Sequence, residues 1–255
     1  MVSFEKLCMI EQITGKKYPS SLTPEQEKLL ASMMQRREQG EPLQYILGEW
    51  EFYGLKIFVG KGVLIPRPET ELLVEKILEF AGNKPDLKIL DLCTGSGCIA
   101  LALKKFLPDA EISAVDVSET ALSYAEKNIK YHHLAIKLFH ADVLDKNFAG
   151  QFQNYDIIVS NPPYLTSEEM KDLQTEVRHE PETALSGISS DGTYFYQEIT
   201  SIWKHALKSG GLLAYEIGWK QAPRVSELLN SNDFEQIQII QDYEHRDRVV
   251  TGQKF

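Results

Sequence analysis

The sequence predicts an α/β fold, with helices packed around a mostly parallel β-sheet, preceded by a small helical domain and a connecting β-hairpin. Two observations support this expectation. From Lys88 onward, short apolar runs typical of buried strands alternate with helical patterns, as in chains of βαβ units. Ahead of Lys88 the pattern changes to two amphipathic helices and an aromatic stretch broken by glycines. The 255 residues, 43% of them hydrophobic, suffice for one substantial core and a small accessory domain.

The N-terminal part is expected to be helical at first. Amphipathic patterns cover Leu7–Ile13 and Pro24–Glu38, and Thr23 is placed to cap the second helix, with Pro24 at its first position. Tyr45–Ile65 is aromatic and β-branched with glycine interruptions, as a hairpin would be. The predicted units are a helical domain, a hairpin linker and a sheet domain, over residues 1–42, 43–67 and 68–255. Four aromatic residues are expected to pack in the core or between domains rather than to form a substrate surface: Tyr18, Trp50, Phe52 and Tyr53.

In the sheet domain, strand and helix patterns follow one another along the chain. Five strands are predicted over Lys88–Leu92, Ile112–Val117, Ile136–His140, Ile157–Ser160 and Leu212–Ile217. Four helices are predicted over Ile99–Phe106, Glu119–Tyr131, Tyr194–Leu207 and Ala222–Asn230. The chain ends in two strand-like runs, Phe234–Ile240 and Arg248–Thr251, joined by a short polar turn. Such a link is too short for a parallel crossover, so the last strand should run antiparallel.

The fourth of these strands ends in an unusual way. Its β-branched run, Ile157–Val159, suits a buried strand and leads into Asn161-Pro162-Pro163-Tyr164. Because neither proline has a backbone N–H, the ladder of the strand must stop at Asn161. The result is a stiff turn with unpaired carbonyls, one amide side chain and one phenol. These groups can form a polar pocket. The alternative is that the turn serves only to end the strand.

The first strand of the sheet domain leads into a glycine-rich loop, DLCTGSG, over residues 91–97. Gly95 and Gly97 let a ligand approach the backbone closely, and the helix that follows directs its free N–H groups there. Asp116, at the end of the next strand, is placed to hold both hydroxyls of a ribose, so a nucleoside site is expected. Gly95-x-Gly97-x-x-Ala100 also fits the dinucleotide fingerprint of dehydrogenases. There are structural alternatives to a nucleoside site. In these, the glycines serve only to form a tight turn, and Asp116 serves only to stabilise the N-terminus of the next helix.

Charge and composition restrict the function. A formal net charge of −10 argues against binding nucleic acid through its phosphates, although a local basic patch stays compatible with it. No stretch approaches the roughly 18 apolar residues of a membrane span, and Met1–Glu5 lacks a signal-peptide pattern. A cytoplasmic location is therefore expected. Three cysteines without a CxxC pair and six histidines without ligand spacing predict neither a disulfide nor a metal site.

Two motifs taken together carry a family resemblance. The loop DLCTGSG and the turn SNPPY, with Asp116 between them, resemble S-adenosylmethionine-dependent methyltransferases that modify planar NH2 groups. Upstream, EPLQYILGEWEFYGLKIFV and LIPRPETELLVEKIL resemble the release factor glutamine methyltransferases of the HemK type, and the resemblance covers nearly the whole chain. Two features depart from that family: Cys93 stands where glycine is usual, and the N-terminal domain is shorter.

The resemblance implies a fold, a cofactor and a substrate. The fold would be that of the class I methyltransferases, Rossmann-like, with a mostly parallel seven-stranded sheet whose last strand is antiparallel. The cofactor would be S-adenosylmethionine, without a metal, and the substrate would be the glutamine of the Gly-Gly-Gln motif in peptide chain release factors. A monomer is expected. The implied cofactor-binding residues are Asp91, Cys93, Thr94, Gly95, Ser96, Gly97, Asp116, Asp142, Val143 and Asn161. The implied catalytic and substrate-binding residues are Asn161, Pro162, Pro163 and Tyr164.

The turn after the fourth strand is suited to align a weak nucleophile. If the side-chain oxygen of Asn161 and the carbonyl of Pro162 each accept one substrate N–H, the nitrogen is held with its π-face toward the methyl group. Acceptor dipoles also stabilise the positive charge that develops on nitrogen. Pro163 would keep the turn rigid, and Tyr164 would pack its ring on the planar amide.

Other positions keep two interpretations. Asp142 with Val143 is expected beside the adenine, or as ordinary loop residues. Asp91 faces the amino group of the methionine moiety or is a satisfied carboxylate at a strand end. The segment Pro66–Glu71 starts a helix with acids in its first turn, and by resemblance it also closes over the cofactor.

Three other functions have to be weighed. Methyltransferases acting on adenine N6 in DNA or guanine N2 in RNA present a similar turn to an NH2 group, but they must reach a base, and this chain combines a short helical domain with an excess of acids. A nicotinamide-dependent oxidoreductase has no evident use for the Asn-Pro-Pro-Tyr turn, and binding of S-adenosylhomocysteine but not NAD would exclude it. A binding module without activity is disfavoured because the whole set of motifs is present.

Overall fold

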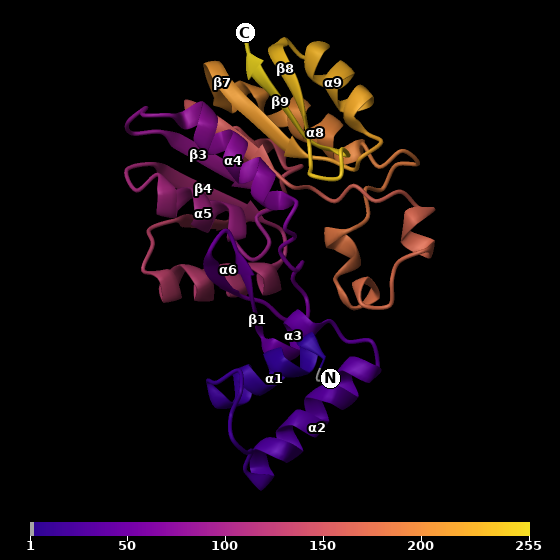
Figure 1. Ribbon diagram of the computed structural model, residues 1–255. Coiled ribbons are helices and arrows are strands. Elements are labelled where there is room, and N and C mark those ends of the chain that lie inside the picture. The colour runs from indigo at the N-terminus through magenta and orange to yellow at the C-terminus, as the bar shows by residue number, and fades with distance from the viewer. Residues whose placement is uncertain (1–2) are drawn as a thin grey trace.

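A seven-stranded β-sheet forms the larger part of the molecule (Figure 1). The computed structural model describes residues 3–255. Met1 and Val2, which open the predicted helical domain and the stretch considered for a signal peptide, lie outside the described residues. The strands occur in the order β5-β4-β3-β6-β7-β9-β8. Their bounds are β3 (Lys88–Leu92), β4 (Glu111–Asp116), β5 (Lys137–His140), β6 (Tyr155–Ser160), β7 (Leu207–Glu216), β8 (Phe234–Gln241) and β9 (Asp247–Lys254).

The strand directions match the prediction. Strands β5, β4, β3, β6 and β7 run parallel to one another, whereas the last strand, β9, is inserted between β7 and β8 and runs antiparallel to both. The short polar turn between β8 and β9 permits only this direction. The mostly parallel sheet with an antiparallel last strand is therefore confirmed.

Helices cover both faces of the sheet, so its central strands are mostly apolar. Ile157 and Val159 of β6 belong to the hydrophobic core on one face and Ile158 to the core on the other. The first core includes residues from α4 (Thr70–Ala81), α5 (Cys98–Phe106) and α6 (Glu119–His132). The second includes residues from α7 (Lys146–Ala149), α8 (Tyr194–Trp203) and α9 (Ala222–Asn230).

The N-terminal helices form a separate small core. It contains residues of α1 (Phe4–Thr14), α2 (Pro24–Glu38) and α3 (Leu43–Leu47): Met9, Leu30, Met33, Leu43 and Ile46. The predicted cap of α2 is confirmed, because Thr23 and Gln26 form a reciprocal capping box and Pro24 is the first helical residue. The hairpin that follows consists of β1 (Glu49–Phe52) and β2 (Leu55–Phe58). The boundaries of the three predicted units stay predictions.

Three local expectations are wrong. Tyr45 belongs to α3 instead of a strand, since a helical turn bounded by Pro42 and by Gly48 at φ 77 precedes the hairpin. The helix expected to reach Leu207 ends at Trp203, and Leu207 already pairs with Tyr155 in the sheet. Tyr18 lies in the loop between α1 and α2 and is 75% exposed, so it packs in no core, whereas Phe52 is buried and Trp50 and Tyr53 pack against the main core as expected.

A long segment between β6 and α8, residues 161–193, leaves the sheet and extends toward the N-terminal helices (Figure 1). It contains three short 3-10 turns, η1 (Glu169–Lys171), η2 (Val177–His179) and η3 (Glu182–Ala184). Arg37 of α2 connects the two parts, because its Nη2 lies 2.9 Å from Oε1 of Glu176. We call residues 161–193 the β6–α8 segment. In residues 3–255, no helix has the length and apolar character needed to cross a membrane.

Candidate active site

The strand-end motifs of the sequence meet at one edge of the sheet. Leu92, the last residue of β3, is paired with Val115 of β4 on one side and with Ser160 of β6 on the other. The chain runs outward from β3 through β4 to β5 and then returns to β6 on the opposite side of β3. This reversal places a crevice beyond the carboxyl ends of β3 and β6, where open α/β sheets bind ligands.

A cleft occupies this place. Nine residues predicted from the sequence line it: Cys93, Thr94, Gly95, Ser96, Asp116, Asp142, Val143, Asn161 and Pro163. Four predicted residues are absent from its lining among the described residues: Asp91, Gly97, Pro162 and Tyr164. The remaining walls include residues that no motif assigned to the cofactor, among them Gly62, Val63, Leu64, Thr183, Ala184 and Phe195.

The glycine-rich loop has the backbone that its sequence predicts. Gly95 and Gly97 both have positive φ, 57° and 79°, which glycine adopts without a steric penalty. A Cβ on Gly97 would lie 3.2 Å from Cβ of Ala125, whereas one on Gly95 would meet no atom within 4 Å. Gly97 is thus needed for packing against α6, and Gly95 faces the open cleft. Cys93 also has positive φ, 60°, a conformation that glycine adopts more easily than cysteine.

Asp116 joins this loop to the end of β4. Its Oδ2 accepts the N–H of Gly95 at 2.8 Å, and its Oδ1 accepts the N–H of Ser118 at 2.9 Å. Burial raises the pKa of this carboxyl, and the bonds from the backbone amides of Ser118 and Gly95 oppose the rise. Helix α6 is capped by Ser118, whose side chain accepts the N–H of Ala121. Asp116 is therefore a loop-organising carboxylate that still borders the cleft.

Asp91 lies beneath the loop. The side chain is fully buried, and its Oδ2 accepts the hydroxyl of Thr94 at 2.6 Å. Its Oδ1 has no hydrogen-bond partner among the described residues. Burial raises its pKa to about 7; the Thr94 hydrogen bond and the nearby backbone N–H of Ala100 oppose this rise, and the neighbouring Asp116 adds to it. One carboxylate oxygen of Asp91 is hydrogen-bonded, as expected of a structural group at a strand end. The other is not, as expected of a group that faces the amino group of the methionine moiety.

The Asn-Pro-Pro-Tyr turn begins where predicted, because β6 ends at Ser160. The side-chain Nδ2 of Asn161 donates to Oγ1 of Thr70 at 3.5 Å. Within residues 3–255, neither Oδ1 of Asn161 nor the carbonyl of Pro162 accepts a hydrogen bond. The backbone after the prolines is held by Gln221, whose Nε2 donates to the Tyr164 carbonyl at 3.0 Å. The turn therefore offers two free acceptors on a fixed backbone.

Tyr164 is absent from the cleft lining among the described residues, and its side chain is directed toward the end of β7. Its hydroxyl donates to Oε1 of Glu216 at 3.4 Å, and burial raises the pKa of the phenol. At the other end of the cleft, Oδ1 of Asp142 accepts the N–H of Leu144 at 2.9 Å. Val143 is buried, and its carbonyl accepts the indole N–H of Trp203 at 2.7 Å.

The segment Pro66–Glu71 both leads into α4 and lines the cleft. Pro66, Arg67 and Thr70 belong to the cleft walls, while α4 begins at Thr70 and has no side-chain N-cap. Arg67 forms an ion pair with Glu180 of the β6–α8 segment, and the second oxygen of Glu180 accepts the N–H of Ile65 at 3.0 Å. The segment can therefore both start α4 and lie against a bound cofactor.

Comparison with known proteins identifies the family. Residues 68–188 match the family model of the methyltransferase small domain, and residues 17–48 match that of the PrmC N-terminal domain. Release factor glutamine methyltransferase of Thermodesulfovibrio yellowstonii is 41% identical, over 91% of this chain and 84% of its own length. The chain belongs to the release factor glutamine methyltransferase family. The protein of that name from Haemophilus influenzae is 36% identical over 97% of this chain and 90% of its own.

Other members differ in length, and solved structures agree on the fold. The family member of Fusobacterium nucleatum is 38% identical, and this chain spans 65% of its length. The catalytic domain of hMettl16, solved with an RNA hairpin, superposes with a TM-score of 0.64 at 17% identity, covering 91% of this chain and 83% of that one. Such a likeness shows the class I methyltransferase fold alone. Together with the sheet described above, it confirms the fold predicted from the sequence.

The cleft fits the cofactor of this family, S-adenosylmethionine. Gly95 leaves open space where a side chain would project. Two buried acceptors or donors beneath the loop, Oδ1 of Asp91 and Oγ of Ser96, lack a partner among the described residues. The acidic Asp116 stands at the end of β4, where enzymes with this kind of sheet hold a ribose. Gly95, Ser96 and Asp116 line the cleft, and an adenosyl compound with an amino acid tail carries hydroxyl and amino groups that can bond to such side chains.

Sequence reasoning missed two residues behind the turn. Thr70 and Glu216 are both buried and hydrogen-bonded to each other at 2.6 Å. Thr70 belongs to the segment Pro66–Glu71, which was predicted to start a helix and to close over the cofactor. Glu216 ends the apolar run LLAYE of β7. Glu216 could have been noticed from its position, because it is a carboxylate at the carboxyl end of a buried parallel strand, next to the strand that leads into SNPPY.

Proposed function

We propose that this protein transfers the methyl group of S-adenosylmethionine to the side-chain nitrogen, N5, of the glutamine in the Gly-Gly-Gln motif of peptide chain release factors. The relatives that define the family are named release factor glutamine methyltransferases. The observation that supports it best is the pair of free acceptors, Oδ1 of Asn161 and the carbonyl of Pro162, on a turn whose Asn161 and Pro163 line the cleft. A primary amide has two N–H donors, which is what two fixed acceptors can hold.

Each group of the cleft would then have a defined task. S-adenosylmethionine, when bound, supplies an electrophilic methyl group carried by a sulfonium. Asp116 would accept the ribose hydroxyls, Asp142 with Val143 would border the adenine, and Asp91 would face the amino group of the methionine moiety. Their carboxylates suit these donors, because a hydrogen bond to a charged group is roughly twice as strong as one between neutral groups.

The substrate amide needs orientation more than a base. Its nitrogen is a poor nucleophile because the lone pair is delocalised into the carbonyl. When Asn161 and Pro162 hold its two protons, the π-face of the nitrogen is aimed at the methyl group, and orientation of this kind is worth on the order of 7–11 kcal/mol in well-aligned systems. The proton leaves after transfer, once the nitrogen has become acidic. Pro163 would keep these acceptors in place.

The substrate class is tested by methyl transfer from labelled S-adenosylmethionine into a whole cell lysate and into purified release factor. We expect label in protein, and mass spectrometry should place one added methyl group on the Gly-Gly-Gln glutamine. Label in DNA or RNA instead would show that the enzyme modifies a base amino group. A release factor modifier acts where translation terminates, so we place the protein in the cytoplasm and expect it to act as a monomer.

A further inference from the structure

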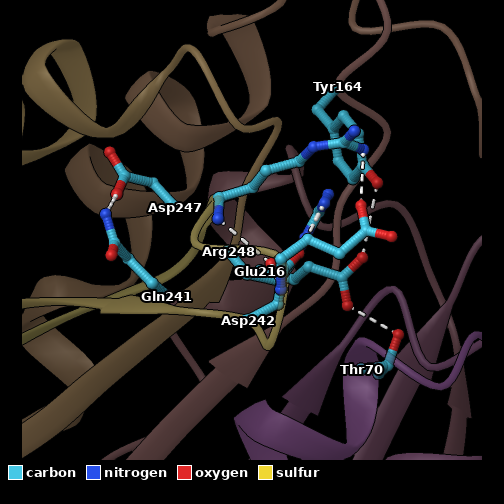
Figure 2. A network of polar contacts seen from close by, with 9 residues as sticks. Thr70, Tyr164, Glu216, Gln241, Asp242, Asp247 and Arg248 are labelled. Atoms are coloured by element: carbon cyan, nitrogen blue, oxygen red, sulfur yellow. Dashed lines mark hydrogen bonds and ion pairs between the residues drawn. The ribbon is translucent and has the colours of Figure 1, made fainter.

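A buried carboxylate lies directly behind the Asn-Pro-Pro-Tyr turn. Glu216 is the last residue of β7, is 2% exposed and is absent from the cleft lining among the described residues. Its Oε2 accepts the hydroxyl of Thr70 at 2.6 Å, and its Oε1 accepts the hydroxyl of Tyr164 at 3.4 Å (Figure 2). The register of the sheet brings it there, because Ser160 pairs with Tyr215 and the next residues, Asn161 and Glu216, follow side by side.

The carboxylate dictates the direction of the hydrogen bonds around it. The hydroxyl of Thr70 has a single proton, and the carboxylate, which can only accept, takes it. Toward Asn161 the same hydroxyl can therefore act only as an acceptor. The atom of Asn161 at 3.5 Å from it is Nδ2, which is a donor. The network Asn161 to Thr70 to Glu216 thus has one consistent direction.

This direction decides which end of the Asn161 amide faces the substrate. The two ends of an amide have nearly the same shape, so only the hydrogen-bond network fixes which end points where. With Nδ2 bonded to Thr70, Oδ1 is turned the opposite way, and it accepts no hydrogen bond among residues 3–255. A reversed amide would present N–H donors to a substrate that itself offers N–H donors.

We propose that Glu216, acting through Thr70, is a positioning residue that holds the amide oxygen of Asn161 toward the substrate NH2 group. The inference rests on the proposed function, since Glu216 and Thr70 would support the turn that holds the substrate amide. Glu216 also holds Tyr164, so one carboxylate is tied to the first and last residues of the Asn-Pro-Pro-Tyr turn. A buried charge is costly unless it is well paired, and here two hydroxyls donate to it while Arg248 is near enough to counter the rise in its pKa that burial causes.

The test compares two substitutions of Thr70 with a matched control. Thr70→Val keeps the shape and removes the hydroxyl, so the Asn161 amide should occupy both orientations. Thr70→Ser restores the hydroxyl. Thr200→Val makes the same change at a buried threonine whose hydroxyl bonds to that of Tyr215 at 3.0 Å, outside the cleft lining. The measurements are single-turnover methylation of release factor, KM for the release factor and affinity for S-adenosylhomocysteine.

For Thr70→Val we expect a fall in kcat of about tenfold or more, the scale of one hydrogen bond to a charged group, with KM and S-adenosylhomocysteine affinity nearly unchanged. Thr70→Ser should recover most of the rate, and Thr200→Val should keep it. If Thr70→Val proves unstable, Glu216→Gln supplies a second variant of nearly unchanged shape. It can present an N–H to Thr70 and should also lower kcat selectively.

Two results would overturn the inference by different routes. Wild-type kcat in Thr70→Val and Glu216→Gln, or losses spread equally over kcat and cofactor affinity, would show that the network is only structural. A wild-type enzyme that leaves the release factor unmodified would instead reject the proposed function itself, and the positioning role with it.

Discussion

At the scale of single residues, the cleft carboxylates combine two tasks. Asp116 already accepts the amides of Gly95 and Ser118, yet each carboxylate oxygen has a second lone pair that a ribose hydroxyl can use. The same side chain therefore sets the shape of the loop and binds the sugar in our proposal. Such sharing keeps the loop formed before the cofactor arrives, which lowers the ordering cost of binding.

Changing Asp116 to Ala should weaken binding of S-adenosylhomocysteine by roughly 1.5–3 kcal/mol, the range for a hydrogen bond to a charged group. The fold should be kept, because the side chain lies at the end of β4 and not inside a core. Isothermal calorimetry measures the affinity, and circular dichroism checks the fold. An affinity equal to that of the wild type would show that Asp116 serves only the loop.

Asp91 predicts a pH dependence of binding. Its pKa is about 7 in the free protein because of burial, and an ammonium group at its unpartnered Oδ1 would favour the ionised form. Binding then lowers this pKa, so affinity for S-adenosylhomocysteine should rise by up to roughly tenfold as pH increases from about 6 and should level off near pH 8. The variant Asp91→Asn should bind more weakly and without this dependence.

Calorimetry at pH 6, 7 and 8 on both proteins decides between the two interpretations of Asp91. If wild-type affinity stays flat over this range, the carboxylate is only a structural group at the strand end.

Much of the cleft could be predicted from sequence because its motifs stand at strand ends. The loop at 91–97, Asp116 and Asn161 each follow a recognisable strand, and parallel strands bring their carboxyl ends to one edge. Glu216 also ends a strand, but its contact with Thr70 could not be predicted, since it depends on the register between β6 and β7 and on where α4 packs. The contact of the Tyr164 hydroxyl with Glu216 has the same origin.

At the scale of elements, β3, α2 and α9 were predicted with their observed bounds, whereas β7 begins at Leu207 instead of the predicted Leu212. β3 was predicted with its observed bounds, since its apolar run is flanked by Pro85-Asp86 and by the glycine loop. α3 was missed because a five-residue helix, Leu43–Leu47, is too short to show a period. The end of α8 was missed because Leu207 suits either a helix or a strand, and only its pairing with Tyr155 decides.

The ion pair between Arg67 and Glu180 connects the linker to the β6–α8 segment, and it predicts a local stability effect. The Glu180 side chain is 1% exposed and that of Arg67 is 32% exposed, so Arg67→Ala leaves a buried carboxylate poorly compensated. We expect a loss of about 2 kcal/mol in the free energy of unfolding, less than the roughly 3–5 kcal/mol of a fully buried pair because Arg67 is partly solvated.

Denaturant unfolding measures this loss, and hydrogen exchange should show faster opening of the β6–α8 segment. Arg224→Ala, which removes an exposed pair with Glu227 on α9, is the control and should change stability by less than about 0.5 kcal/mol. Equal effects of the two substitutions would show that Arg67 does not stabilise the β6–α8 segment through its ion pair with Glu180.

At the scale of the whole molecule, the helical domain is a separate core attached to the sheet domain near the cleft. Its helices pack on one another, and Arg37 connects α2 to Glu176 of the β6–α8 segment, which also supplies cleft residues. A protein substrate lying across both parts would meet the cleft and the helices together. A small cofactor has no need of such a domain, so we assign it to recognition of the release factor.

Removing residues 1–47 should therefore separate the two binding tasks. S-adenosylhomocysteine affinity should change little, whereas kcat/KM on intact release factor should fall by about tenfold or more, as when a contact surface with one strong hot spot is lost. The removal includes α3 so that no half of the small core is left exposed. Full kcat/KM in the shortened protein would give the domain another role.

The measurement that tests the central claim most directly is single-turnover methylation of release factor by Asn161→Ala at saturating cofactor. The claim is that this side chain aligns the substrate amide, so removing one acceptor while Pro162 and Pro163 keep the turn should act mainly on kcat. By comparison with the loss of one oxyanion-hole donor, the cost should be roughly 2.7–4 kcal/mol, a rate loss on the order of a hundredfold to a thousandfold. Affinity for S-adenosylhomocysteine should change much less. A wild-type rate of methyl transfer in Asn161→Ala would contradict the positioning mechanism.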